Sequence, residues 1–268
     1  MFNVYNSYLI SYIHMTYIYI IIFIFGTLIG SFLNCLIYRL ENKKSFVSGR
    51  SFCPRCKHKL AWYDLIPIFS FIFLKAKCRY CKKKISWQYP IVELTTGLLF
   101  LLIVSYQLSI FNFINLVFLF FIFSSMLAIF IYDLKHFIIP DKIIYPLIVI
   151  TLFYSIINNQ LSIINCLLAG IGAALFFLSI YLISKGKWLG FGDVKLALFL
   201  GLFLGWPNII LSLFLSFFIG AIIGVGLMLF KGKGLKSQVP FAPFLILGSF
   251  IAFFWGERLF NWYFSLIF

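Results

Sequence analysis

Long apolar runs alternate with short polar connections along almost the whole chain. Runs near the length needed to cross the hydrocarbon core of a bilayer, about 20 residues, occur at eight places. They cover residues 15–38, 91–107, 110–132, 142–158, 162–183, 194–206, 208–230 and 241–267, and the sixth is short. The pattern predicts an all-α polytopic membrane protein with about eight transmembrane helices.

Composition supports this class. Hydrophobic residues make up 63% of the 268 residues, 36 of them are Phe, and the mean hydropathy is +1.05, which is more than a soluble core of this length could bury. The first run has no Lys or Arg before it and thirteen soon after it, the reverse of a secretory signal peptide, so we expect a retained anchor. We predict a first transmembrane helix at 1–38, a cytoplasmic basic loop at 39–90 and a transmembrane core at 91–268.

The basic residues follow the connections. Of the 22 Lys and Arg residues, 21 fall at 39–84, 135–142, 185–195 and 231–236, which are alternate connections of an eight-helix chain. The positive-inside rule makes that side cytoplasmic and turns both termini outward. The net charge of +15 is therefore interpreted as a topological signal and an attraction to anionic membrane lipid, and we expect no nucleic-acid partner.

Two aspartates stand at the ends of apolar runs, where a carboxylate is costly. Asp133 ends the third run and Asp193 begins the sixth, at comparable depth on the predicted cytoplasmic side. Two close carboxylates in a site of low dielectric share one proton, the state that an aspartic protease uses. The alternative is that each aspartate stabilises a helix end, and Asp141 is the second choice as partner of Asp193.

The large basic loop contains two CxxC pairs separated by 21 residues, formed by Cys53, Cys56, Cys78 and Cys81. Four thiolates at this spacing suit a tetrahedral structural zinc, and free thiols or two disulfides are the alternatives. Between the pairs, residues 68–74 are too short to span and too apolar for water, so we expect them at the membrane interface. Cys35 and Cys166 lie within apolar runs and are interpreted as small packing residues.

Glycines recur at four-residue spacing within the apolar runs. We expect close helix packing at these positions, which are Gly26 and Gly30, Gly201 and Gly205, and Gly220 and Gly224.

An ordered set of motifs resembles the type IV prepilin peptidases, the bifunctional leader peptidase and N-methyltransferase family of GxGD-type aspartic membrane proteases. The motifs follow the family's order over nearly the whole chain: GSFLNCLIYRL from Gly30, CPRC, WYDLIP, CRYC, YPIVEL, YDLKHFIIPD, GFGDVKLA and PFAPFL. The resemblance implies that Asp133 and Asp193 are the catalytic pair and that the four loop cysteines bind zinc.

The resemblance also implies a substrate and a second activity. The family cuts pilin-like or pseudopilin-like precursors, which carry a short basic leader, at the cytoplasmic face of the bacterial inner membrane. It then methylates the new N-terminal residue with S-adenosylmethionine. No residue is assigned to that cofactor; the zinc loop and residues near Glu93 and Arg39 are candidates through the resemblance alone. Two departures, Leu40-Glu41 and Trp87-Gln88, bear mainly on the methyltransferase.

Two other classes remain as alternatives. In an ion- or proton-coupled carrier, Asp133 and Asp193 would be ion ligands near broken helices, but that reading predicts inverted repeats and midplane polar residues, which the sequence lacks. A structural docking component of a pilus or secretion machine would explain the cysteines and leave the aspartates unexplained.

Overall fold

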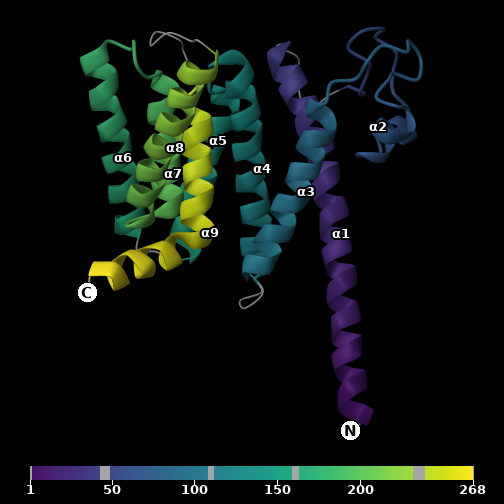
Figure 1. Ribbon diagram of the computed structural model, residues 1–268, viewed down its shortest axis with the longest axis horizontal. Coiled ribbons are helices and arrows are strands. Elements are labelled where there is room, and N and C mark those ends of the chain that lie inside the picture. The colour runs from purple at the N-terminus through teal and green to yellow at the C-terminus, as the bar shows by residue number, and fades with distance from the viewer. Residues whose placement is uncertain (1, 43–48, 108–111, 159–162, 232–238, 268) are drawn as a thin grey trace. The chain divides into compact units, whose positions relative to one another are not determined.

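The computed structural model describes residues 2–42, 49–107, 112–158, 163–231 and 239–267 (Figure 1). Its described residues form helices joined by loops, with two isolated β-bridges, Phe52 to Lys59 and Lys77 to Lys84. The elements are α1 (Phe2–Glu41), the 3-10 helix η1 (Trp62–Leu65), α2 (Phe69–Phe73), α3 (Gln88–Gln107), α4 (Phe113–His136), α5 (Asp141–Asn158), α6 (Ile163–Ser184), α7 (Phe191–Leu204), α8 (Asn208–Lys231) and α9 (Ala242–Ile267).

All eight predicted segments are helices, but only six are long and apolar enough, within the described residues, to be candidate membrane spans. These six correspond to α1, α3, α4, α6, α8 and α9. The expectation of about eight spans is therefore met for six segments, while α5 and α7 are helices outside this set. With 14 residues, α7 is about 21 Å long, less than a bilayer core requires.

The chain divides into two compact units, residues 1–124 and 125–268. In the first, α1 packs along α3. A Cβ added at Gly26 would lie 2.8 Å from the Cα of Gly97, and one at Gly30 would lie 2.7 Å from the Cα of Glu93. The predicted close packing is confirmed at this glycine pair, because only residues without a side chain let the two backbones approach so closely.

In the second unit, α7 packs against α5, α6, α8 and α9. Its buried residues lie on every side of the helix, as expected for an apolar helix surrounded by other helices. Gly205 ends α7 two residues earlier than predicted, with a positive φ of 65° and its N–H bonded to the Gly201 carbonyl. Because neighbouring helices cover α7, it does not need the length of a lipid-exposed span.

The remaining glycines give a mixed result. Gly201 lies against α6, where an added Cβ would meet the Ala169 carbonyl oxygen at 2.5 Å, and Gly220 lies against Phe244. At Gly224 an added Cβ would meet no atom of the described residues within 4 Å, so the predicted close packing is wrong there. Of the two helical cysteines expected to pack, Cys166 is buried and Cys35 is partly exposed.

Candidate functional site

The end of α4 and the start of α7 bring two buried carboxylates together in the second unit. Asp133 is 5% exposed and Asp193 is 8% exposed, and they are close enough to interact electrostatically. Figure 1 shows the α4–α5 and α6–α7 connections at the same end of this unit, which accounts for the matched depth of the two residues. The structure thus juxtaposes the two aspartates that the sequence singled out.

Each carboxylate of this pair accepts a backbone hydrogen bond. Asp193 Oδ2 accepts from the N–H of Gly190 at 3.0 Å, which forms part of a capping interaction at the start of α7. Asp133 accepts from the N–H of Ala242, the first residue of α9. Because backbone groups do not titrate, these bonds orient both carboxylates without adding a charged partner to the pair.

Asp141, the rival partner of Asp193, lies elsewhere. Its carboxylate is 59% exposed and pairs with Lys195 Nζ at 2.6 Å, while the Lys195 ammonium also lies over the rings of Tyr145 and Phe191. This ion pair ties the start of α5 to the first turn of α7. The helix-terminus explanation fits Asp141, which stands in the first turn of α5.

An apolar contact lies one residue before Asp193, at Gly192. A Cβ added at Gly192 would meet the Cβ of Ile139 at 3.1 Å, closer than side chains normally approach. The glycine therefore allows the first turn of α7 to settle against the segment between α4 and α5, which fixes where Asp193 stands.

The four loop cysteines also converge. The Sγ atoms of Cys53, Cys56, Cys78 and Cys81 all lie within 4.8 Å of one another, and the Cys53 and Cys81 atoms are 4.0 Å apart. A tetrathiolate zinc site requires sulfur–sulfur separations of about 3.8 Å, so the donor set fits this metal. Two disulfides are not formed, because all four thiols are free.

The environment of Cys53 favours its thiolate. Burial raises the pKa of Cys53, but hydrogen bonds from the backbone N–H groups of Cys56 and Arg55 and from neighbouring thiols outweigh it and lower the pKa to about 7. Metal ligation requires the deprotonated sulfur, so these N–H groups prepare the residue for a cation.

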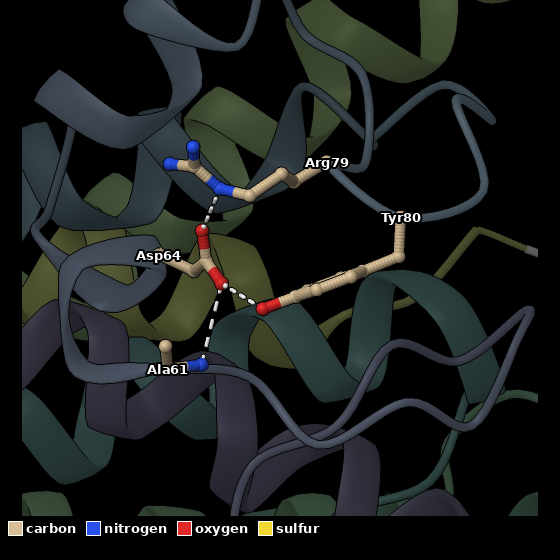
Figure 2. A network of polar contacts seen from close by, with 4 residues as sticks. All are labelled: Ala61, Asp64, Arg79 and Tyr80. Carbon is tan, nitrogen blue, oxygen red and sulfur yellow. Dashed lines mark hydrogen bonds and ion pairs between the residues drawn. The ribbon is translucent and has the colours of Figure 1, made fainter.

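Two residues between Cys78 and Cys81, Arg79 and Tyr80, bind Asp64 in the middle of the loop (Figure 2). The Asp64 carboxylate accepts from Arg79 Nε at 2.8 Å, from the Tyr80 hydroxyl at 3.1 Å and from the Ala61 N–H at 3.2 Å. The Asp64 side chain is only 3% exposed. Burial and the hydrogen bond to Asp64 raise the pKa of Tyr80 to about 12, which keeps its hydroxyl a donor at neutral pH.

The two residues suggested through the resemblance for the second activity are both bonded to backbone. Glu93 accepts from the Ile68 N–H at 2.7 Å and from the Ser31 hydroxyl. Arg39 Nη2 donates to the Gly49 carbonyl at 2.6 Å. The structure therefore places both residues where they join helices of the first unit to the cysteine loop.

Nearby, the buried Asn34 side chain donates to the Tyr89 carbonyl at 3.1 Å and accepts from Gln88 at 3.2 Å. Motifs 55 residues apart in the sequence thus meet where α1 faces the start of α3.

Sequence reasoning missed three contacts of this site. Asp64 and Ala242 lie within motifs that the sequence displayed, WYDLIP and PFAPFL, but nothing in a linear sequence pairs them with Arg79 or Asp133. Lys195 stands two residues after Asp193 and could have been noticed as a cation near a proposed carboxylate pair.

Comparison with known proteins agrees with this geometry. Residues 24–107 match the family model of the bacterial peptidase A24 N-terminal domain, and residues 118–225 match that of the type IV leader peptidase family. No solved structure matches the chain.

Three curated relatives are each named prepilin leader peptidase/N-methyltransferase. The Bacillus subtilis (strain 168) protein is 32% identical, covering 92% of this chain and 98% of its own. The Legionella pneumophila protein is 30% identical, covering 96% and 98%, and the Aeromonas salmonicida (strain A449) protein is 29% identical, covering 92% and 94%. With two family models matched in order and relatives aligned from end to end, the chain belongs to the type IV leader peptidase family.

Proposed function

We propose that this multi-pass membrane protein is a prepilin leader peptidase and N-methyltransferase whose peptidase centre is the pair Asp133 and Asp193. The observation that carries the proposal is the meeting of two buried carboxylates at one end of the second unit, each oriented by a backbone N–H. The substrate is a pilin-like or pseudopilin-like precursor with a basic leader followed by a hydrophobic helix.

The pair cleaves the peptide bond by general acid–base catalysis. Two neighbouring carboxylates in a low-dielectric site hold one proton between them. The ionised member takes a proton from a water molecule as the water oxygen attacks the scissile carbonyl carbon, and the protonated member donates its proton to the carbonyl oxygen. The tetrahedral diol then collapses: the carboxyl group that took the proton from water gives it to the leaving nitrogen, the other carboxylate takes a proton from a diol hydroxyl, the C–N bond breaks and the C=O bond re-forms, so that one water molecule is consumed in all.

The peptidase centre faces the cytoplasm, across the bacterial inner membrane from the pilus. The connections at 135–142 and 185–195, which flank the aspartates, are basic and lie at the same end of the second unit (Figure 1). The positive-inside rule assigns such an end to the cytoplasm. A basic leader is synthesised on that side, so the scissile bond and the carboxylates are in the same compartment.

Zinc held by Cys53, Cys56, Cys78 and Cys81 stabilises the loop. The metal would cross-link two chain segments, and with four thiolate ligands it would have no open position for a substrate. Arg79 and Tyr80, between the last two cysteines, pass this constraint to Asp64. The loop thereby keeps one shape without taking part in peptide hydrolysis.

S-adenosylmethionine supplies the methyl group for the second activity, which the names of the relatives include. The methyl group on the donor's sulfonium sulfur would be transferred to the amino nitrogen that cleavage exposes, and that nitrogen would lose one proton. Glu93 and Arg39 are already bonded to Ile68 and Gly49, so their role in this step is to shape the loop beside α1 and α3.

The test is leader release from a precursor peptide by the purified, detergent-solubilised protein, measured by mass. Asp133→Asn and Asp193→Asn should each abolish release, whereas Asp141→Asn, a matched change at an exposed ion pair, should retain it. Release by either of the first two variants would refute the acid–base mechanism. Failure of the wild-type protein on several precursors would favour a carrier or docking protein. A methyl mass gained with S-adenosylmethionine tests the second activity separately.

A further inference from the structure

The cysteine loop carries a concentrated group of exposed apolar side chains. In α2, Phe69, Ile72 and Phe73 are 62%, 63% and 81% exposed, and their i, i+3, i+4 spacing puts them on one face of the helix. Trp62, at the start of η1, is 78% exposed. Leu65 and Ile66, between η1 and α2, are also exposed, and apolar side chains gathered in this way on a basic loop require an apolar partner.

The depth of this face is set by a bond to a membrane-spanning helix. The Ile68 N–H, immediately before α2, donates to Glu93 Oε2 at 2.7 Å. Glu93 is buried and lies five residues inside α3, about 7.5 Å along the helix from its start. With the start of α3 taken as the membrane boundary, the start of α2 is held within the depth of roughly 5–10 Å at which interfacial helices lie.

A second contact fixes which side of α2 faces the protein. Phe71, the buried residue of α2, packs edge to face on Trp87, just before α3, with ring centroids 5.0 Å apart. The opposite side, with Phe69, Ile72 and Phe73, is thus turned away from this contact. Figure 1 shows α2 level with the first turns of α3 and below most of the loop.

The lysines that follow α2 indicate the headgroup charge of the lipid. Lys75 and Lys77 follow α2 directly and are exposed, and Lys82, Lys83 and Lys84 continue the basic surface up to α3. A short apolar face bordered by lysines matches a bilayer whose acyl chains accept the aromatic residues and whose headgroups are anionic.

We propose that η1 and α2 form an interfacial anchor that inserts Trp62, Phe69, Ile72 and Phe73 into an anionic phospholipid leaflet, at a depth set by the bond between Ile68 and Glu93. The anchor holds the cysteine loop against the membrane next to α3. It does not depend on the proposed peptidase activity.

Site-specific photocrosslinking of the full-length protein in nanodiscs tests the anchor. Benzoylphenylalanine at Phe73 should form phospholipid adducts detectable by mass, as should the same probe at Leu98, an exposed position on the spanning helix α3. The matched loop control at Arg55, between the first two cysteines, should give few. The proposal is overturned if the probe at Phe73 gives no lipid adduct while the probe at Leu98 does. It is also overturned if the probe at Phe73 forms adducts only when precursor is added and these adducts contain the precursor.

Two further arms test the tether and the headgroup. Glu93→Ala should lower the lipid yield at Phe73 severalfold and leave the Leu98 yield unchanged, which also shows that the spans remain folded. Exchanging phosphatidylcholine for phosphatidylglycerol should raise the Phe73 yield, and Lys75→Gln with Lys77→Gln should remove that increase. An unchanged yield at Phe73 in Glu93→Ala refutes the tether, and equal yields in both lipids refute the anionic preference.

Discussion

The two units of the chain surround their buried carboxylates with different partners. In the first, Asp64 pairs with Arg79 and accepts from the Tyr80 hydroxyl, in a loop whose four cysteines lie close together. In the second, Asp133 and Asp193 are close enough to interact electrostatically, and each accepts a hydrogen bond from a backbone N–H. The first arrangement links loop segments through an ion pair, while the second leaves two carboxylates without a cationic partner between them, as the proposed peptidase mechanism requires.

The contrast teaches how burial relates to role. A buried carboxylate that forms an ion pair with a cationic side chain has little chemical freedom, as Asp64 shows beside Arg79. Two buried acids side by side cannot both ionise, so their shared proton remains available for transfer. Buried carboxylates of similar exposure can therefore serve as a structural link or as the proposed catalytic centre, according to what faces them.

The largest effect is expected from Asp193→Asn. Leader release should fall by about 10²–10⁴-fold or more, since one half of the acid–base pair is lost. The melting temperature should stay the same or rise, because a carboxyl group that is costly to ionise when buried is replaced by a neutral amide. Parallel measurements of release, thermal unfolding and bound zinc check this. Loss of zinc from this variant would show that the two units are not independent.

Cys78→Ser should have the opposite effect to Asp193→Asn: zinc should be lost while leader release is partly kept. We expect loss of bound metal, measured by elemental analysis, and rapid proteolysis within residues 49–87, but partial retention of leader release. Zinc affinity should also fall as pH is lowered, because protons compete for the thiolates, beginning near the pKa of Cys53, about 7. Complete loss of release in a folded Cys78→Ser protein would contradict the separation of roles.

Gly201→Ala should destabilise the second unit by about 1–3 kcal/mol, because its Cβ would stand 2.5 Å from the Ala169 carbonyl oxygen at the contact between α6 and α7. Gly224→Ala is the matched control on a spanning helix. There the added Cβ has free space among the described residues, so stability should be unchanged or slightly higher. Thermal unfolding in one detergent compares the two variants; equal shifts would refute the packing explanation.

The smallest effect is expected from Asp64→Asn. The amide retains an oxygen for one hydrogen bond but loses the charge that Arg79 contacts, so the loop should open more often. Limited proteolysis should cut the loop faster, with no change in the unfolding temperature of the whole protein. Tyr63→Phe keeps the ring under Arg79 and the Asp64 charge but removes a hydroxyl that bonds Tyr80, so it should speed cleavage less than Asp64→Asn does.

The sequence alone predicted most of the helical architecture, since eight apolar runs correspond to eight helices. Six of the eight are long and apolar enough, within the described residues, to be candidate spans, and α7 is the short helix that its short apolar run predicted. The sequence also predicted close packing at Gly224, where the structure has space. Helix–helix contacts depend on which face each helix presents, and glycine spacing does not specify that face. The three-part division of the chain at residues 38 and 90 stays a prediction.

Residue type and spacing by themselves determined the class of protein, the family and the chemistry available: apolar runs, two cysteine pairs and two isolated aspartates express local physical requirements. Tertiary structure alone decided the partners. It put Asp133 rather than Asp141 beside Asp193, joined Asp64 to Arg79 and Tyr80, and fixed the start of α2 to Glu93. Such contacts join residues 15 to 60 positions apart, and no local preference of the chain encodes which of them will meet.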